Sequence, residues 1–448
     1  MATFHITKGH NLKISGIPDK KVVHLPCPSS IKIIPDHYES VKPKLLVKEG
    51  DQIKIGDKLF FDKNNSSIFF CSHVSGEIIS IKFGERRKIE EIEISCENNE
   101  TVIEKPKINI PSSSPDDIKN ILLETGLWPT IRQRPFSKIA DPSLTPKSIF
   151  VTGMPTAPFS LDLNHILKGE NSSIQMGFDI IKKLTNGNIN LVLERNKSYD
   201  IFSDLNSVEI HHFSGPHPSG NTGIHIHHID PIANREDVVW YISLQDLRDI
   251  GKFFKDGSYP SEKHISCGGS CLSNPSYYKL KKGMVISDIL KNQKIDSDNI
   301  IISGDVLSGQ QTDKDSPLNF YADILSVIPY SKKRDFLGWI LPGVNKYSLS
   351  RTFLSSFFDK KETNFDTRIN GSRRAIIPFG RWERMLPMDI LPDFLIKSIL
   401  AKDIEDMENY GIYECDHEDF SLCAYACQSK VEVSKIVKEG LELIEKEG

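Results

Sequence analysis

The chain has 448 residues, of which 38% are hydrophobic and 26% charged, and its formal net charge is −4. This composition is typical of globular domains, and the length favours about three or four of them. Because the lysines are interleaved with acids and form no long basic block, the sequence indicates no surface for nucleic acid.

The N-terminal stretch MATFHITKGH lacks the basic start and apolar core of a secretory signal. No stretch reaches the roughly 18 apolar residues that a membrane-spanning helix requires. We therefore expect any membrane role to depend on a partner.

The first 103 residues have an all-β pattern. Within residues 42–62, short apolar strands are interrupted by Gly50-Asp51 and Gly56-Asp57, which suit tight turns, and residues 74–79 form another turn and strand. This pattern resembles lipoyl and biotinyl barrel-sandwich domains. Lys63 is the candidate for an acyl-carrying lysine, but the loop of residues 63–76 is longer than a carrier hairpin, so a structural domain is favoured.

A proline- and serine-containing linker, about residues 101–114, precedes a predicted helix. Ser114 suits its N-cap, Pro115 its first turn, and the helix ends near Gly126. Strands at residues 148–154, 189–193 and 207–213 then alternate with helical sequence at 178–185. This order predicts a Rossmann-like α/β domain with a largely parallel sheet.

The last third of the chain has two patterns. Residues 264–344 contain short strands at 284–286, 299–304 and 324–328 with a short helix near Ile289, which is typical of a β-grasp unit. Helical patterns follow at residues 391–400, 419–427 and 431–444. The predicted domains are therefore a lipoyl-like barrel-sandwich hybrid (1–103), a Rossmann-like α/β domain (104–260), an SLBB-like β-grasp domain (261–345) and a helical domain (346–448).

Six histidines gather between residues 211 and 228, and we expect His225 and His227 to share one face of a strand. Three interpretations stay open: a metal site, a ligand or quinone pocket, and a structural or interface role. The histidines are His211, His212, His217, His225, His227 and His228.

Two segments combine arginine with large apolar residues. Trp128, Arg132, Arg134 and Phe136 follow the helix that ends near Gly126; arginine and tryptophan are favoured at interfaces, and ordinary packing is an equal alternative. In residues 379–392, a docking surface and a buried interdomain loop are equally favoured. The docking candidates in that second segment are Arg381, Trp382, Arg384 and Met385.

The sequence shows no recognisable nucleotide or metal motif. It lacks a phosphate-binding P-loop, a G-x-G-x-x-G after a strand and a G-x-S-x-G elbow. Cys267 and Cys271, like Cys423 and Cys427, have three residues between them, and neither pair has a second pair nearby. We therefore predict structural or free thiols and no metal site.

Four stretches in this order resemble one family over essentially the whole chain: LLVKEGDQIKIGDKLFFDK, GLWPTIRQRPFSK, GIHIHHIDP and GRWERMLPMDILP. The family is that of the A subunits of bacterial sodium-translocating NADH:quinone reductases, which is related to the C subunit of Rnf complexes and to the flavin subunit of respiratory complex I. The resemblance implies the same four domains.

The flavin-bearing relatives hold FMN and nucleotide with a loop of several glycines. Its equivalent here is Glu124–Thr130, in which only Gly126 remains, while Leu127 and Trp128 stand where backbone would approach phosphates. The cysteine run of the Rnf-type relatives is also missing. We therefore predict that this chain binds no FMN, NADH or iron–sulfur cluster.

The resemblance implies a peripheral subunit on the cytoplasmic side of the bacterial inner membrane. Its partners would be the B to F subunits, chiefly the membrane-embedded B subunit, in a translocase that passes electrons from NADH to ubiquinone and exports sodium. The whole complex would supply NADH, flavin and iron–sulfur chemistry, and the isolated chain would not be catalytic. The candidates for quinone binding are Trp128, Arg132, Arg134, Phe136, His225 and His227; the alternative is a purely structural docking subunit without a ligand of its own.

Overall fold

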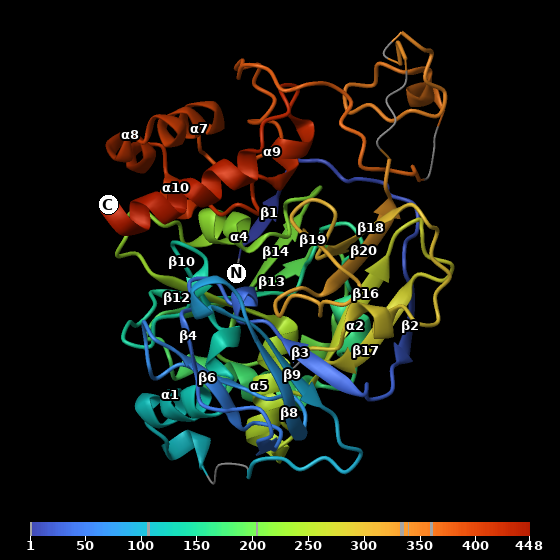
Figure 1. Ribbon diagram of the computed structural model, residues 1–448. Helices are drawn as coiled ribbons and strands as arrows, with labels where there is room; N and C mark the ends of the chain where they lie inside the picture. Colours follow the sequence, from blue (N-terminus) through green and yellow to red (C-terminus); the bar gives the residue numbers. More distant parts are fainter. Residues whose placement is uncertain (1, 105–107, 203–204, 332–335, 339, 359–361) are drawn as a thin grey trace.

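A computed structural model of the protein describes residues 2–104, 108–202, 205–331, 336–338, 340–358 and 362–448 (Figure 1). The described strands form a seven-stranded, a six-stranded, a four-stranded and a three-stranded sheet. Within these residues, no helix combines the length and apolar character needed to cross a lipid bilayer.

The barrel-sandwich domain consists of the two smaller sheets. The four-stranded sheet has the order β3-β9-β8-β5 and the three-stranded sheet the order β4-β6-β7. The predicted turns are confirmed, since Gly50 and Gly56 have φ angles of +87° and +92°, a region that glycine occupies without steric cost. The strands are β3 (Ser30–Ile33), β4 (Pro43–Leu45), β5 (Gln52–Ile53), β6 (Lys58–Asp62), β7 (Phe69–Cys71), β8 (Gly76–Phe83) and β9 (Ile89–Ser95).

The expected long loop of residues 63–76 is wrong, because it contains β7. Phe69 and Phe70 pair with Phe61 and Phe60 of β6, so the loop after Lys63 is short. The run of three apolar residues in β7 carried too weak an alternation to be recognised as a strand.

The first two strands of the chain leave the barrel-sandwich domain. β1 (Thr3–His5) pairs in parallel with β14 (Glu209–Ser214) of the seven-stranded sheet. β2 (Asp19–His24) pairs in parallel with β17 (Ser276–Lys281) of the six-stranded sheet. The two sheets of the barrel-sandwich domain thus begin with β3 at Ser30, while the predicted domain bounds of 1–103 stay a prediction. Short edge strands have no sequence feature that specifies their partner, because any strand with free backbone groups can accept them.

The seven-stranded sheet, with the order β1-β14-β13-β12-β15-β10-β11, is parallel from β1 to β15 and antiparallel at β10 and β11. Its remaining strands are β10 (Arg132–Arg134), β11 (Lys138–Ile139), β12 (Ser148–Thr152), β13 (Asn188–Glu194), β14 (Glu209–Ser214) and β15 (Val239–Ser243). Along β12, Ile149 and Val151 face one hydrophobic core while Phe150 faces another, so both sides of the sheet are covered.

The helices of this domain are α1 (Pro115–Glu124), α2 (Leu163–Ile166), α3 (Asn171–Lys182), α4 (Thr222–Ile229) and α5 (Leu244–Asp256). The predicted start of α1 is confirmed: Ser114 and Asp117 form a reciprocal capping box, with Pro115 in the first turn. Helix α3 begins at Asn171, before the predicted Phe178.

The β-grasp domain contains the six-stranded sheet β19-β18-β20-β16-β17-β2. Its elements are β16 (Glu262–Gly268), β17 (Ser276–Lys281), α6 (Ile286–Ile289), β18 (Asn299–Ser303), β19 (Gln310–Thr312) and β20 (Ile324–Pro329). The strand predicted at residues 284–286 is wrong, because Met284 lies outside any strand and Ile286 opens α6.

The C-terminal helices are α7 (Pro392–Ala401), α8 (Ile404–Asn409), α9 (Ser421–Ala426) and α10 (Val433–Glu447), close to the predicted positions. They lie together above the seven-stranded sheet on the side of α4 (Figure 1). One hydrophobic core joins Phe150 and Phe213 of the sheet to Leu395, Phe420 and Val437, which fixes the helical domain on the sheet.

Candidate functional site

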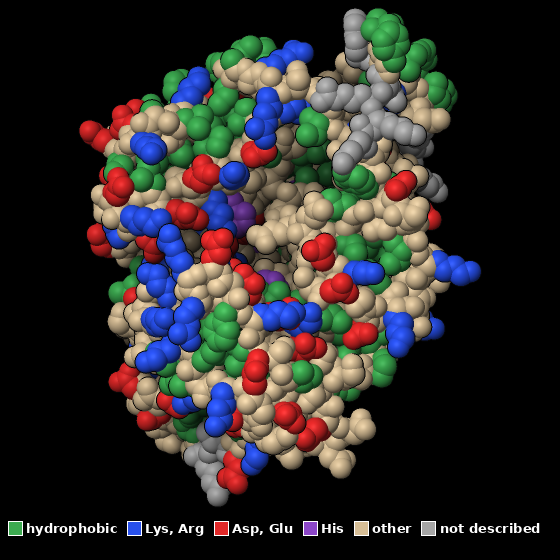
Figure 2. Space-filling view, viewed as in Figure 1, with side chains coloured by type: hydrophobic (Ala, Val, Ile, Leu, Met, Phe, Trp, Pro, Cys, Tyr) green, Lys and Arg blue, Asp and Glu red, His purple; other side chains and the backbone are tan. Residues whose placement is uncertain are grey.

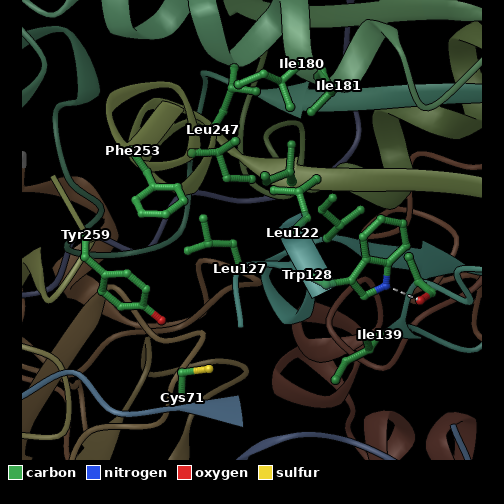
Figure 3. Close-up of a cluster of buried hydrophobic side chains, with 14 of the residues drawn as sticks. Cys71, Leu122, Leu127, Trp128, Ile139, Ile180, Ile181, Leu247, Phe253 and Tyr259 are labelled. Carbon is green, nitrogen blue, oxygen red and sulfur yellow. Dashed lines mark hydrogen bonds between the residues drawn. The ribbon is translucent and has the colours of Figure 1, made fainter. Parts of the chain in front are cut away.

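The segment Glu124–Thr130, which we expect to be the equivalent of a flavin loop, begins at the end of α1. Leu127 and Trp128 are buried, and Figure 3 shows them within a layer of apolar side chains from α1, α3, α5 and β7. The indole N–H of Trp128 donates to the carbonyl oxygen of Ala140 at 2.7 Å, and its ring meets Trp240 edge-on with ring centroids 5.4 Å apart. Trp128 is therefore a core residue whose faces are covered by protein.

Several backbone N–H groups in this segment already donate hydrogen bonds within the chain. Gly126 donates to Leu123, Leu127 donates to Leu122 and Thr130 donates to Leu127, at 3.0–3.2 Å. A Cβ atom on Gly126 would lie 2.7 Å from the sulfur of Cys71, so the backbone is pressed against β7. A phosphate cradle needs free, inward-pointing N–H groups and open space beside glycine, and this arrangement does not fit a flavin phosphate.

Arg132 and Arg134 alternate along β10 and have different environments. Arg132 is partly exposed; it donates to the carbonyl oxygen of Ser137 at 2.6 Å and lies 3.3 Å from the carboxylate of Glu39. Its guanidinium stands over the ring of Tyr321, 4.8 Å from the centroid. Arg132 therefore links β10 to the barrel-sandwich and β-grasp domains.

Arg134 is fully buried and faces three carboxylates of the C-terminal domain. One guanidinium nitrogen lies 2.9 Å from both Asp416 and Glu418, and the other lies 3.6 Å from Asp419. Sequence reasoning missed these acids, although DHED at residues 416–419 is visible as a charged run, because such runs ordinarily face solvent.

The single positive charge of Arg134 cannot balance three carboxylates. The pKa values of the acidic residues around it are therefore shifted in different directions. Burial opposes ionisation of Asp416, but the charges of Arg134 and His417 hold its pKa well below the ordinary value. Burial, with the negative charges of Glu418 and Asp416, raises the pKa of Asp419 to about 7. The charge of Asp416 raises the pKa of His417 to about 9, so this histidine carries a proton at neutral pH.

His225 and His227 lie on helix α4, and the expected strand is wrong. Asn221 precedes the helix in extended conformation, and the Ile-His alternation that suggested a strand is divided between buried and half-buried faces. His225 is fully buried against Phe213 and donates to the carbonyl oxygen of Ser219 at 2.9 Å; burial lowers its pKa to about 3. Tertiary packing has overridden a local pattern of period two.

His227 connects α4 to the C-terminal domain. Its Nδ1 donates to the carboxylate of Glu414 at 2.5 Å, and its Nε2 accepts a hydrogen bond from the backbone N–H of Asp389 at 3.0 Å. Elsewhere in the cluster, His211 bonds Asn190 and His217 bonds Thr156. Across the described residues, no group of three or more His, Cys, Asp or Glu side chains is placed to hold a metal ion.

The second arginine-rich segment is divided between core and surface. Trp382 and Met385 are buried in the C-terminal core, whereas Arg384 is exposed and Arg381 is half-buried. The structure thus separates the expected docking residues: the two apolar ones pack within the chain, and the two arginines are accessible.

Phe136 lies at the boundary of β10 and the C-terminal domain. Its ring meets Tyr413 edge-on with centroids 6.1 Å apart, and the guanidinium of Arg235 stands 5.7 Å from its centroid. It therefore packs between domains and does not share a cavity with Trp128.

The cysteines contain no disulfide among the described residues. Cys267, Cys271, Cys423 and Cys427 are buried free thiols. Burial raises the pKa of Cys267 to about 12, so this side chain stays a thiol and is a poor metal ligand.

Three domain models match the chain in the same order as its domains. The NqrA N-terminal barrel-sandwich hybrid domain matches residues 4–97, the NqrA second alpha/beta domain matches residues 113–259, and the NQRA C-terminal domain matches residues 264–314. The A subunit of the Na(+)-translocating NADH-quinone reductase of Pasteurella multocida is 36% identical, with 99% of each chain covered. The corresponding A subunits of Neisseria meningitidis serogroup B and of Haemophilus influenzae Rd are each 35% identical at the same coverage. The chain belongs to this family of A subunits.

Membership of this family confirms the resemblance inferred from the four sequence stretches. It also confirms the predicted fold class, since the matched domains are a barrel-sandwich hybrid, an α/β domain and an SLBB-type domain, followed by helices. The chain is accordingly one component of an oxidoreductase complex, and it covers 99% of the length of these relatives.

One buried feature of the chain was not foreseen. His73, between the barrel-sandwich and β-grasp domains, is almost fully buried, and neither ring nitrogen has a partner among the described residues. It stacks on Phe320 with ring centroids 6.1 Å apart beside a narrow cavity lined also by Tyr38 and Lys282. The sequence has no local signal for it, because a lone histidine in a turn is ordinarily solvated.

Proposed function

We propose that this chain is a peripheral docking subunit of a sodium-translocating NADH:quinone reductase and supports electron transfer through its contacts with other subunits. The observation that carries the proposal is the filled loop at Glu124–Thr130. Buried Leu127 and Trp128, with the hydrogen bonds made by the backbone, leave no place for a flavin phosphate. NADH oxidation, flavin and iron–sulfur chemistry then belong to the partner subunits.

The geometry favours the structural role over quinone binding at the predicted residues. Trp128, Arg134 and His225 are fully buried. Arg132, Phe136 and His227 are partly accessible, but each is engaged in contacts between domains. Trp128 and His225 are enclosed in the α/β domain, whereas Arg132 and Arg134 both lie over the ring of Tyr241, 5.3 and 5.4 Å from its centroid. Two of the six candidates are therefore closed off from a ligand by protein atoms.

We place the chain on the cytoplasmic side of the inner membrane, with the membrane-embedded B subunit as its chief partner among the B to F subunits. The support is the family, whose name joins NADH, quinone and sodium translocation in one assembly. In this arrangement, sodium export and reduction of ubiquinone occur in the membrane partners, and this chain binds those partners and positions them relative to one another.

The proposal is tested on the purified complex. We expect the chain, after separation from its partners under mild conditions, to release no flavin on denaturation and to contain no iron. Stoichiometric flavin or iron retained by the separated chain would refute the cofactor-free assignment. Absence of the chain from a purified active complex would refute its role as a component of the assembly.

Quinone binding is tested separately by titrating the complex with ubiquinone. Trp128→Phe should lower the melting temperature of the chain, because it removes the hydrogen bond to Ala140, and should leave the quinone Kd of the assembled complex unchanged. Arg132→Gln should also leave that Kd unchanged. A tenfold rise in the quinone Kd for either variant, in a fully assembled complex, would instead support a quinone site at these residues.

A further inference from the structure

Helix α7 (Pro392–Ala401) is apolar on two opposite sides. Leu395, Ile396 and Ile399 face inward and are buried in the C-terminal core. Leu391, directly before the helix, and Phe394 and Leu400 lie on the outer side, and each is more than half exposed. Lys397 lies between Phe394 and Leu400 on this outer side, which a solvated helix would ordinarily fill with polar residues. The exposed apolar residues around it therefore indicate a missing contact.

The apolar surface continues beyond the helix. Ile377 and Phe379 are also more than half exposed, and they line one small cleft together with Trp382 and with Asp393 of α7. The α7 surface is defined here as Ile377, Phe379, Leu391, Phe394 and Leu400. Single exposed apolar residues are normal, whereas a contiguous group of this kind marks an interaction site.

Exposed apolar residues are concentrated in this part of the chain. Fourteen of the twenty-two large hydrophobic residues that are clearly exposed in the described structure lie between Phe336 and Leu400, including Phe336 at 89% and Phe357 at 82%. Figure 2 shows hydrophobic side chains along the upper edge of the molecule, where Figure 1 places α7 and the segment after residue 336. The exposed hydrophobic residues are therefore gathered on one side of the molecule.

Charge and backbone conformation identify the kind of partner. Lys397 stands on the exposed stripe between Phe394 and Leu400, with its ammonium 5.7 Å from the centroid of the Phe394 ring, and Arg384 is exposed nearby in sequence. The stretch that carries Ile377 and Phe379 has neither helix nor strand. A bilayer core does not accept irregular backbone facing lipid, whereas a polypeptide can provide hydrogen bonds to it.

We propose that the α7 surface binds an apolar segment of another subunit of the same complex, with a carboxylate of that segment opposite Lys397. This inference rests on the proposed function and assigns a surface to it. Proteins that are permanently associated bury largely apolar interfaces. The α7 surface has this apolar character, with Lys397 standing among its apolar residues. A charge buried in that position needs a carboxylate opposite it.

The decisive experiment places a photoreactive phenylalanine analogue at position 394 in the full chain, within the membrane-derived complex. Position 83 is the matched control, because Phe83 is similarly exposed but lies on β8 of the barrel-sandwich domain. We expect irradiation to join position 394, and not position 83, to a different subunit. Adducts at 394 only with lipid, only with a second copy, or with nothing, in a complex that contains the chain, would overturn the inference.

A second experiment does not depend on cross-linking. Phe394→Asp with Leu400→Asp should reduce, at least tenfold, the recovery of the chain with a tagged partner protein of the complex, whereas Ile79→Asp with Phe83→Asp should not. The melting temperature of each isolated variant should match that of the unaltered chain, since all four positions are exposed. If the isolated variant melts lower, the cross-linking result at position 394 decides alone.

Two results would contradict this proposal without affecting the proposed function. One is full recovery of the Phe394 and Leu400 double variant with the complex. The other is flotation of the isolated chain with phosphatidylglycerol vesicles that is lost in the double variant while assembly is retained, because the occupant would then be lipid. Failure of the unaltered chain to co-purify at all would contradict the proposed function itself.

Discussion

The guanidinium of Arg134 lies 2.9 Å from the carboxylate of Asp416, and both side chains are buried. Arg134 belongs to the antiparallel strand β10, next to the edge strand β11 of the seven-stranded sheet, and Asp416 precedes α9. This pair therefore joins the α/β domain to the C-terminal helices. A buried pair contributes little net stability by itself, but removal of one partner leaves the other charge without compensation.

Arg134→Met should therefore lower the free energy of unfolding by about 3–5 kcal/mol, because Asp416 and its neighbours lose their cation in a buried site. Arg373→Met is the control: Arg373 is exposed and paired with Glu432 at the surface, and the change should stay within about 0.5 kcal/mol. Chemical denaturation measures both. Similar losses for the two variants would contradict the burial of the Arg134 cluster.

His417 gives this cluster a pH dependence. Its pKa in the folded chain, about 9, exceeds its ordinary value of 6.5, so the protonated ring stabilises the fold fully below pH 6.5 and loses that effect as the pH rises through 9. His417→Gln should cost up to about 3 kcal/mol at pH 6 and much less at pH 9.5. Denaturation curves at both pH values test this, with His165→Gln, on the exposed side of α2, as the control; a cost independent of pH would refute it.

Gly126 should tolerate no side chain. Its φ angle of +68° is unfavourable for other residues, and a Cβ atom would lie 2.7 Å from the Cys71 sulfur. Gly126→Ala should cost about 3 kcal/mol, whereas Gly50→Ala should cost only about 1 kcal/mol, since Gly50 has a positive φ but no atom within 4 Å of the added carbon. Thermal melting of the two variants separates steric from conformational cost, and equal losses would argue against close packing of the filled loop on β7.

His73→Phe should leave the fold unchanged or stabilise it by roughly 1 kcal/mol, because it removes two buried nitrogens without partners and keeps a ring between Tyr259 and Phe320. The matched variant is His225→Phe, which leaves the carbonyl of Ser219 without its donor and should cost about 1–3 kcal/mol. Chemical denaturation compares them. Destabilisation of similar size in both would mean that His73 makes polar contacts that the arrangement of protein atoms does not reveal.

The local elements could be predicted because their causes lie within a few residues. The capping box of Ser114 and Asp117, the turns at Gly50 and Gly56, and the buried strand at Ser148 follow from side-chain hydrogen bonds, backbone freedom and apolar runs. The sequence also predicts a filled flavin loop, since Leu127 and Trp128 are bulky where a phosphate cradle needs glycine, and this stays a prediction.

The strand partners, one helix and the burial of individual side chains depend on contacts between distant parts of the chain. The sequence by itself established the domain order, the family resemblance and the absence of a glycine-rich loop. Only the tertiary structure decided that β1 and β2 join other sheets, that Ile224 to His228 form a helix, and that Trp128 is core. The burial of a side chain and the choice of its partner depend on residues hundreds of positions away, as with Arg134 and Asp416. The sequence around a residue does not specify those distant neighbours.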